Sequence, residues 1–123
     1  MAVIKKNYAG FSKFQRLAKG TRTCLTAYKL TTDFPREETF GLRHSIRKTA
    51  VDTPAYIAEG AGKTNDAEFA ASINFALSLA MRLEYSALVA RDLELVNPVS
   101  YDGFSIKIVE VKKMLGGFKK TLA

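Results

Sequence analysis

The segment at residues 60–64 (GAGKT) carries the most recognisable chemical signature in this sequence. A glycine-rich turn followed by lysine and threonine resembles the end of a P-loop, in which backbone amides and the lysine hold phosphates. The full pattern needs a glycine five residues before Gly62, where this chain has Ile57, and a strand before the loop, where we predict a helix. We therefore interpret the glycines as structural. Gly60 suits the left-handed position that ends a helix, and Gly62 lets the chain reverse.

Catalysis and metal binding need clusters that this composition does not supply. His44 is the only histidine and Cys24 the only cysteine, which excludes a histidine cluster and a cysteine-based zinc site. We interpret His44 as a surface residue and Cys24 as a small core or boundary residue. Asp52, Glu59 and Glu84 share predicted helices with basic residues, so ion pairs explain them better than acid–base chemistry. We predict no enzymatic activity, no cofactor and no metal.

Glu59 stands at the predicted end of its helix, just before the glycine turn. The carboxyl end of a helix disfavours an anion because its free carbonyl groups are partly negative. We therefore expect Glu59 to have a specific basic partner.

Positive charge is unevenly distributed along the chain. The 123 residues include 19 Lys or Arg and 12 Asp or Glu, a net charge of +7, and residues 1–32 hold seven cations and no acid. Four further lysines follow Glu110 with no acid among them. Clustered cations favour a polyanionic partner, and the alternative is a solvated face that keeps the protein soluble. The candidate nucleic-acid-binding residues are Lys13, Arg16, Lys19 and Arg22 on the first predicted helix and Arg43, Arg47 and Lys48 on the second.

These cations favour phosphate contacts over recognition of bases. Tyr56 and Tyr101 can stack on bases, but aromatic residues this sparse in the sequence do not predict a platform for single strands.

Composition indicates one folded domain spanning residues 1–123. A hydrophobic content of 47% excludes disorder. The chain has no run of 18 uncharged apolar residues, and its N-terminal segment lacks the apolar stretch of a signal peptide. We therefore expect a soluble, cytoplasmic protein.

Turn signals at residues 32–35, 60–62 and 97–98 divide the chain into four segments, each with helical periodicity and none with strand-like alternation. We predict an all-α, antiparallel up-down-up-down four-helix bundle. Pro54 lies inside the second pattern, so we expect a kink there rather than two helices. The predicted core faces are Phe11, Phe14, Leu17 or Ala18, Thr21, Leu25 and Tyr28; then Leu42, Ile46, Ala50, Thr53 and Ile57; then Phe69, Ile73, Ala76, Ala80, Leu83, Ala87 and Ala90; and finally Phe104, Ile108, Val111, Leu115, Phe118 and Leu122.

Helix ends are predicted from capping residues. Asn65, with Glu68 three residues later, starts the third helix, which we expect to reach about Leu95. Ser100 or Asp102 is expected to cap the fourth. The third helix carries a second apolar stripe on a different face, and we expect that stripe to meet another subunit. Its members are Phe75, Leu79, Val89 and Leu93.

Motifs across residues 28–95 resemble the bacterial four-helix-bundle proteins, also called the 23S rRNA intervening-sequence family. The matching stretches are residues 28–31 (YKLT), 34–38 (FPREE), 40–42 (FGL), 46–51 (IRKTAV), and 57–60 (IAEG) followed by Gly62 and Lys63. Departures from the family pattern occur at polar positions, namely Ser45, Tyr56, Ser78, Leu79 and Arg82. The motif residues to which the resemblance gives a structural role are Pro35, Gly41, Ile57, Ala58, Glu59, Gly60, Gly62 and Lys63.

This resemblance implies a closed four-helix bundle that assembles as a homopentamer, without enzymatic activity. Several members are encoded within insertions in large-subunit ribosomal RNA genes. A related branch, the accessory variability determinants of diversity-generating retroelements, binds nucleic acid and a reverse transcriptase. Two functions are therefore expected. The first is binding of nucleic acid, RNA rather than DNA, and the alternative is a scaffold for a protein partner such as a reverse transcriptase.

Overall fold

The computed structural model describes residues 13–62 and 65–122 of the chain, with side chains from residue 17 to 121 in these ranges. This part contains four α-helices, one short 3₁₀ helix and no strand, as expected for an all-α protein. The elements are α2 (Lys13–Thr31), η2 (Arg36–Glu38), α3 (Leu42–Gly60), α4 (Asp66–Asp92) and α5 (Pro98–Leu122). None of the described helices is long and apolar enough to cross a membrane.

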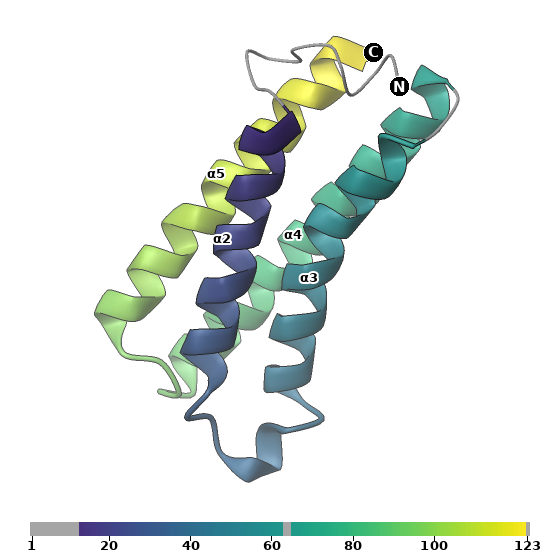
Figure 1. The fold of residues 1–123 in the computed structure, drawn as a ribbon. Helices are drawn as coiled ribbons and strands as arrows, with labels where there is room; N and C mark the ends of the chain where they lie inside the picture. Colours follow the sequence, from purple (N-terminus) through teal and green to yellow (C-terminus); the bar gives the residue numbers. More distant parts are fainter. Residues whose placement is uncertain (1–12, 63–64, 123) are drawn as a thin grey trace.

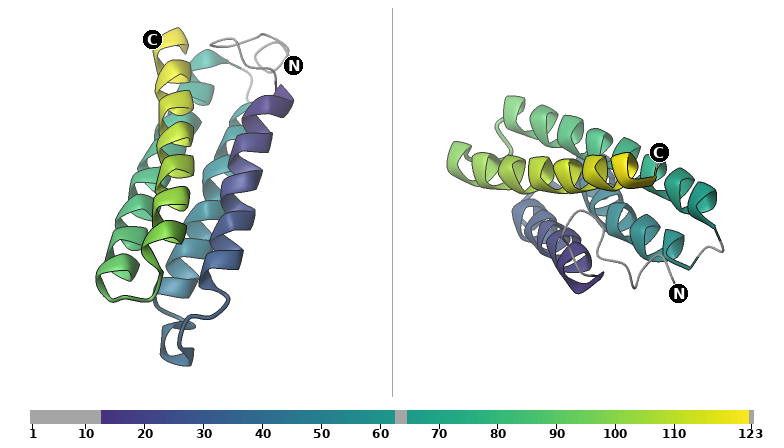
Figure 2. Two further views of the ribbon diagram at one scale, coloured as in Figure 1. Left: turned by 90° about the vertical axis from the view of Figure 1, so that its left-hand side faces the viewer. Right: turned by 90° about the horizontal axis from the view of Figure 1, so that it is seen from above.

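The four helices lie lengthwise against one another (Figures 1 and 2). Each packs against the next in the chain, and α2 also packs against α5. In Figure 1, η2 and the connection from α4 to α5 lie at one end of the molecule, and the end of α3 and the start of α4 lie at the other. Two buried clusters fill the interior, one nearer each end. Phe69, Ile73, Leu115 and Phe118 belong to the first, and Ile46, Leu83, Phe104 and Ile108 to the second.

The predicted core faces of α3, α4 and α5 are confirmed. Every residue predicted for the α4 face is buried, and so are those of the other two faces, with two exceptions. Leu42 at the start of α3 is half-buried, and the Leu122 side chain lies outside the described part. Apolar residues at helical spacing form a continuous stripe along each of these helices, which is why the pattern was sufficient here.

The predicted core face of α2 is wrong over its described length. Leu25 is 57% exposed and Tyr28 43% exposed, and Thr21 is exposed as well. Leu17 and Ala18 are half-buried, and the predicted Phe11 and Phe14 side chains lie outside the described residues. The buried face consists instead of small residues, which let the α2 backbone approach its neighbours closely. They are Gly20, Thr23, Ala27 and Thr31.

Pro54 lies within α3, which continues through it as one helix, as predicted, and the kink expected there stays a prediction. A proline has no N–H to donate to the carbonyl four residues earlier, here that of Ala50. Its ring faces α2 at a glycine, because a Cβ atom on Gly20 would lie 2.6 Å from the Pro54 Cβ. The close packing of α2 against α3 at this proline therefore depends on the absence of a side chain at Gly20.

The helix ends confirm one predicted cap and correct another, and α4 ends earlier than expected. Asn65 Oδ1 accepts the Glu68 N–H at 2.9 Å, as expected. The fourth helix begins at Pro98, and the N–H of Ser100 donates to Asn97 Oδ1 at 2.8 Å, so Asn97 is the cap. Ser100 and Asp102 lie inside the helix, because proline suits its first position. Likewise, α4 ends at Asp92 and not near Leu95.

Gly60 does not adopt the left-handed conformation expected for it. It is the last residue of α3, and Ala61 after it is right-handed (φ −64°, ψ −20°). A Cβ atom on Gly60 would lie 2.6 Å from Ser72 Cβ and 2.8 Å from Phe69 Cδ1. Gly60 therefore allows α4 to pack closely against the end of α3. Gly62 follows in the turn and donates its N–H to the Glu59 carbonyl at 3.0 Å.

Candidate nucleic-acid interface

An open groove on the outer side of α2 and α3 brings together three of the predicted cations, Arg43, Arg47 and Lys48. We call it the basic groove. His44 also lines it and is exposed, as expected for a surface histidine. The remaining lining residues are Tyr28, Thr39, Val51 and Asp52.

Arg43 joins the start of α3 to the end of α2. Its Nε donates to the Thr31 carbonyl at 3.1 Å, and its Nη2 donates to the carbonyls of Thr32, at 3.4 Å, and Phe34. These carbonyls end the preceding helix or follow it, where partners inside the helix are missing. The guanidinium therefore stabilises the connection between α2 and α3, and its positive charge remains in the basic groove.

Arg47 makes a second link to the same helix end. Its Nε donates to Thr31 Oγ1 at 2.8 Å, its Nη2 donates to the Tyr28 carbonyl at 3.3 Å, and its guanidinium carbon lies 4.5 Å above the centre of the Tyr28 ring. A cation is favourable at the carboxyl end of a helix, because the helix dipole is negative there. Sequence reasoning missed Thr31 and Tyr28 as partners because they precede Arg47 by more than fifteen residues.

The FPREE and FGL motifs position the start of α3. Pro35 precedes η2, and Glu38 at the end of η2 accepts the Leu42 N–H on Oε1 at 2.9 Å. A Cβ atom on Gly41 would lie 2.6 Å from that carboxylate oxygen, so a side chain there would displace the cap. A carboxylate at the amino end of a helix is favourable. These motif residues thereby set the direction in which Arg43 leaves α3.

Lys48 is the most solvent-accessible of the three cations. Its side chain is 62% exposed and its Nζ lies 3.0 Å from Asp52 Oδ2, one turn along α3. A pair this exposed is weak, so an incoming phosphate can compete with the carboxylate for the ammonium group.

The predicted basic face of α2 is not a single face. A three-residue step turns a helix by about 300°, so four such positions spread over about half its circumference. Lys19 is turned towards α5, where its Nζ lies 3.5 Å from Glu110 Oε2, whereas Arg22 is exposed. Lys13 and Arg16 lie within α2, but their side chains are outside the described part.

The acidic residues partly follow the expected ion pairing. Lys112 Nζ on α5 donates to Glu84 Oε1 on α4 at 2.8 Å, and Asp52 pairs with Lys48. Glu59 is exposed and makes no ion pair with the residues that the structure describes, so the expected basic partner is not found among them. Lys63 of the same motif lies outside the described residues, as does Thr64.

Side chains that commonly bind metals do not cluster in residues 13–62 and 65–122. No group of three or more His, Cys, Asp or Glu side chains is arranged there to hold a metal ion. Cys24 is half-buried at the edge of the core, and burial raises the pKa of its thiol, which lowers the fraction of reactive thiolate. The GAGKT segment follows helix α3, whereas a P-loop follows a strand.

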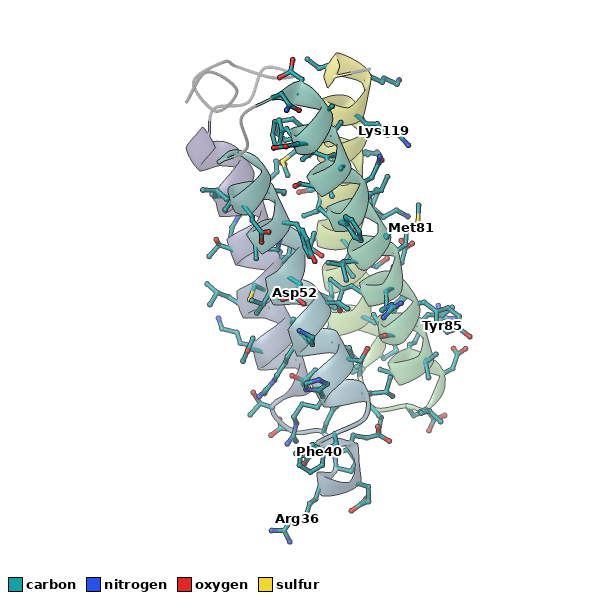
Figure 3. All side chains as sticks on the ribbon, turned by 90° about the vertical axis from the view of Figure 1, so that its right-hand side faces the viewer. Arg36, Phe40, Asp52, Met81, Tyr85 and Lys119 are labelled. Carbon is teal, nitrogen blue, oxygen red and sulfur yellow. The ribbon has the colours of Figure 1, made fainter. Side chains whose placement is uncertain are left out.

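A second groove runs between α3 and α4, and we call it the aromatic groove. Its centre is the pair Tyr56 and Phe75, whose rings stack with centroids 5.5 Å apart and an interplanar angle of 15°. Figure 3 shows Asp52 on α3 in this region, whereas Met81 and Tyr85 project from the opposite edge of α4. The other lining residues are Lys48, Asp52, Ser78, Leu79 and Arg82.

The departures from the family pattern converge on the α3–α4 side of the molecule. Tyr56, Ser78, Leu79 and Arg82 all line the aromatic groove. Ser45 forms a 3.0 Å hydrogen bond with Ser86 across the same two helices. These five positions therefore lie on two adjacent helices, an arrangement that the linear sequence does not reveal.

Comparison with models of known protein families shows the family of this chain. The family model for the 23S rRNA-intervening sequence protein matches residues 12–117, which include α2, α3, α4 and most of α5. A search of curated proteins found no match. The matched region contains the Arg43 and Glu38 connections at the start of α3 and the IAEG stretch that packs on α4. The motifs, the four helices and this match together establish that the chain belongs to the 23S rRNA-intervening sequence protein family.

Proposed function

We propose that this protein is a non-enzymatic, oligomeric RNA-binding protein that contacts RNA phosphates through the basic groove. The observation that carries the proposal is the convergence of Arg43, Arg47 and Lys48 in one open groove whose only acid is Asp52. Binding to phosphates through such a surface is driven by counterion release and has little sequence preference. The family description, which refers to ribosomal RNA, favours RNA as the partner.

Assembly belongs to the same proposal. We propose an up-down-up-down four-helix bundle that forms a homopentamer, for which the family resemblance supplies the number of subunits. The support for association is the exposed apolar surface of α4, on which Met81 is 52% exposed and Leu93 57% exposed. Of the predicted second stripe, Phe75 and Leu93 are exposed and Leu79 and Val89 half-buried. In a ring of five the charge of +7 would repeat to about +35, which strengthens attraction of RNA.

Titration of a fluorescent RNA hairpin at several salt concentrations tests the RNA-binding proposal. We expect the logarithm of affinity to fall steeply and linearly with the logarithm of salt. Lys48→Gln should weaken binding and reduce the slope by about one unit. Lys113→Gln is the matched control, because Lys113 is an exposed lysine on α5 that does not line the groove. A parent protein that binds no RNA at low salt contradicts the proposal.

A scaffold for a protein partner, such as a reverse transcriptase, is the second candidate. The exposed Met81 and Tyr85 on the outer edge of α4 favour it, because exposed apolar surface commonly marks a protein interface (Figure 3). Purification from native lysate, with and without ribonuclease, separates the two functions. A stoichiometric protein that stays bound after ribonuclease treatment would favour the scaffold.

A further inference from the structure

The stacked pair in the aromatic groove leaves one aromatic ring accessible to solvent. Tyr56 is half-buried and packs against the core cluster that contains Ile57 and Phe69. Phe75 stacks on it from α4 and remains 60% exposed. Tyr56 therefore anchors the Phe75 ring in one orientation, and an incoming planar group can extend the stack.

Positive charge lies beside this ring. Arg82 follows Phe75 by two helical turns on α4, is exposed, and forms no ion pair within the described part of the chain. Lys48 reaches the groove from α3. Two cations and one acid, Asp52, which pairs with Lys48, thus line the same groove as the exposed Phe75 ring. A nucleotide combines a planar base with an anionic phosphate and matches this arrangement. A second apolar protein surface would match it less well, because it would bury Arg82 without a partner.

The aromatic groove continues from the basic groove. Both are lined by Lys48 and Asp52, which lie on the outer face of α3. From Arg47 in the basic groove to Tyr56 in the aromatic groove the helix rises by about 14 Å. A strand that follows the cations along α3 therefore reaches the stacked pair without crossing the protein.

We propose that the aromatic groove binds a nucleotide from a single-stranded RNA segment, with its base stacked on Phe75 and its phosphates against Arg82 and Lys48. This inference rests on the RNA binding proposed above, assigns Phe75 to RNA in place of the subunit contact expected for it, and adds the class of RNA, which is unpaired strands or loops. Bases within a duplex are already stacked on one another and do not present a free face to the ring.

Binding of two defined probes tests the inference. The probes are a short oligo(A) strand and an RNA duplex of the same length, titrated at several salt concentrations. Phe75→Leu keeps the apolar volume but removes the ring, and should weaken oligo(A) binding by about tenfold. The salt slope and the duplex affinity should not change, because no phosphate contact is lost. Arg82→Gln should instead reduce the oligo(A) salt slope by about 0.7.

Tyr85→Leu is the matched control for loss of an aromatic ring. Tyr85 lies on the same helix, is 67% exposed and does not line the groove. A direct signal is also accessible because the chain has no tryptophan. The fluorescence of Phe75→Trp should be quenched on binding oligo(A), and that of Tyr85→Trp should not.

Three results would overturn the inference, and each points to a different explanation of the aromatic groove. If Phe75→Leu binds oligo(A) as tightly as the parent and Tyr85→Leu, stacking is absent while binding through charge stands. If Phe75→Leu changes the oligomeric mass in light scattering, the groove is a subunit contact. If the parent binds neither probe at low salt, the proposed RNA-binding function fails together with the inference.

Discussion

Gly20 of α2 and Pro54 of α3 face each other so closely that a Cβ atom on Gly20 would lie 2.6 Å from the Pro54 Cβ. Real side chains do not approach so closely, so the two helices can pack here only with glycine on one side. The proline ring takes the place that a side chain of α2 would otherwise occupy. This contact lies next to Thr23 and Thr53, which are buried and bonded to carbonyls of their own helices.

Gly20→Ala should therefore destabilise the protein although alanine is the better helix former. Overpacking costs about 1–3 kcal/mol, which outweighs a helix-propensity gain of up to about 1 kcal/mol. Gly103→Ala is the control, because a Cβ atom on Gly103 in α5 meets nothing within 4 Å. That substitution should stabilise the protein by up to about 1 kcal/mol. Urea denaturation followed by circular dichroism measures the change in unfolding free energy for both variants. Changes of the same sign for Gly20→Ala and Gly103→Ala would contradict the packing argument.

Arg47 should contribute to stability through Thr31, unlike its neighbour Lys48. Removing a hydrogen bond to a charged group costs about 1.5–3 kcal/mol, and Arg47→Gln loses such contacts to Thr31 Oγ1 and the Tyr28 carbonyl. Lys48→Gln breaks only an exposed pair and should cost less than about 1 kcal/mol. A double-mutant cycle of Arg47→Gln with Thr31→Val should give a coupling free energy of about 1 kcal/mol. If the effects of the two substitutions on stability are additive, the 2.8 Å contact between Arg47 Nε and Thr31 Oγ1 contributes no coupling free energy.

Glu94 should be replaceable with a gain in stability. It has φ 60°, and it follows the end of α4 with its N–H donating to the Arg91 carbonyl while the Leu95 N–H donates to that of Ala90. This is the Schellman ending of a helix, whose left-handed residue is most often glycine. Glu94→Gly should raise the unfolding free energy by about 0.5–1 kcal/mol, and Glu94→Val should lower it. Thermal denaturation of the two variants and the parent is the measurement. A lower midpoint temperature for Glu94→Gly than for the parent would contradict the prediction.

Cys24 should be alkylated slowly in the folded protein. Burial raises the pKa of its thiol, so less thiolate is present at a given pH than in the unfolded chain. The folded state thus holds the proton more tightly. The resulting stabilisation is fully present below the pKa of the unfolded thiol and is lost as pH rises through the raised pKa of the folded one. Mass spectrometry after iodoacetamide treatment, with and without urea, should show faster reaction in urea at the same pH.

Much of the fold could be predicted because α3, α4 and α5 carry apolar residues at helical spacing, large ones in α5 and mainly alanines in α4. Phe104 and Ile108, for example, are one turn apart on the same face of α5, and both are buried. The chemistry of the surface could be predicted in part for a similar reason. Arg43 and Arg47 are one turn apart on a helix, so local geometry alone places both on one side of α3.

Tertiary structure decided what depends on contacts between distant segments. The buried face of α2 follows from how closely α3 approaches at Gly20, and hydrophobic periodicity gives little weight to the glycine and threonines on that face. The partners of Arg47 lie on another helix. The Tyr56–Phe75 pair likewise joins two helices across nineteen positions of sequence. By itself, the sequence determined helix type and local amphipathic faces, because these depend on neighbours within one or two turns. Packing determined which faces meet and which side chains share a groove, because these depend on backbone approach distances that no local pattern encodes.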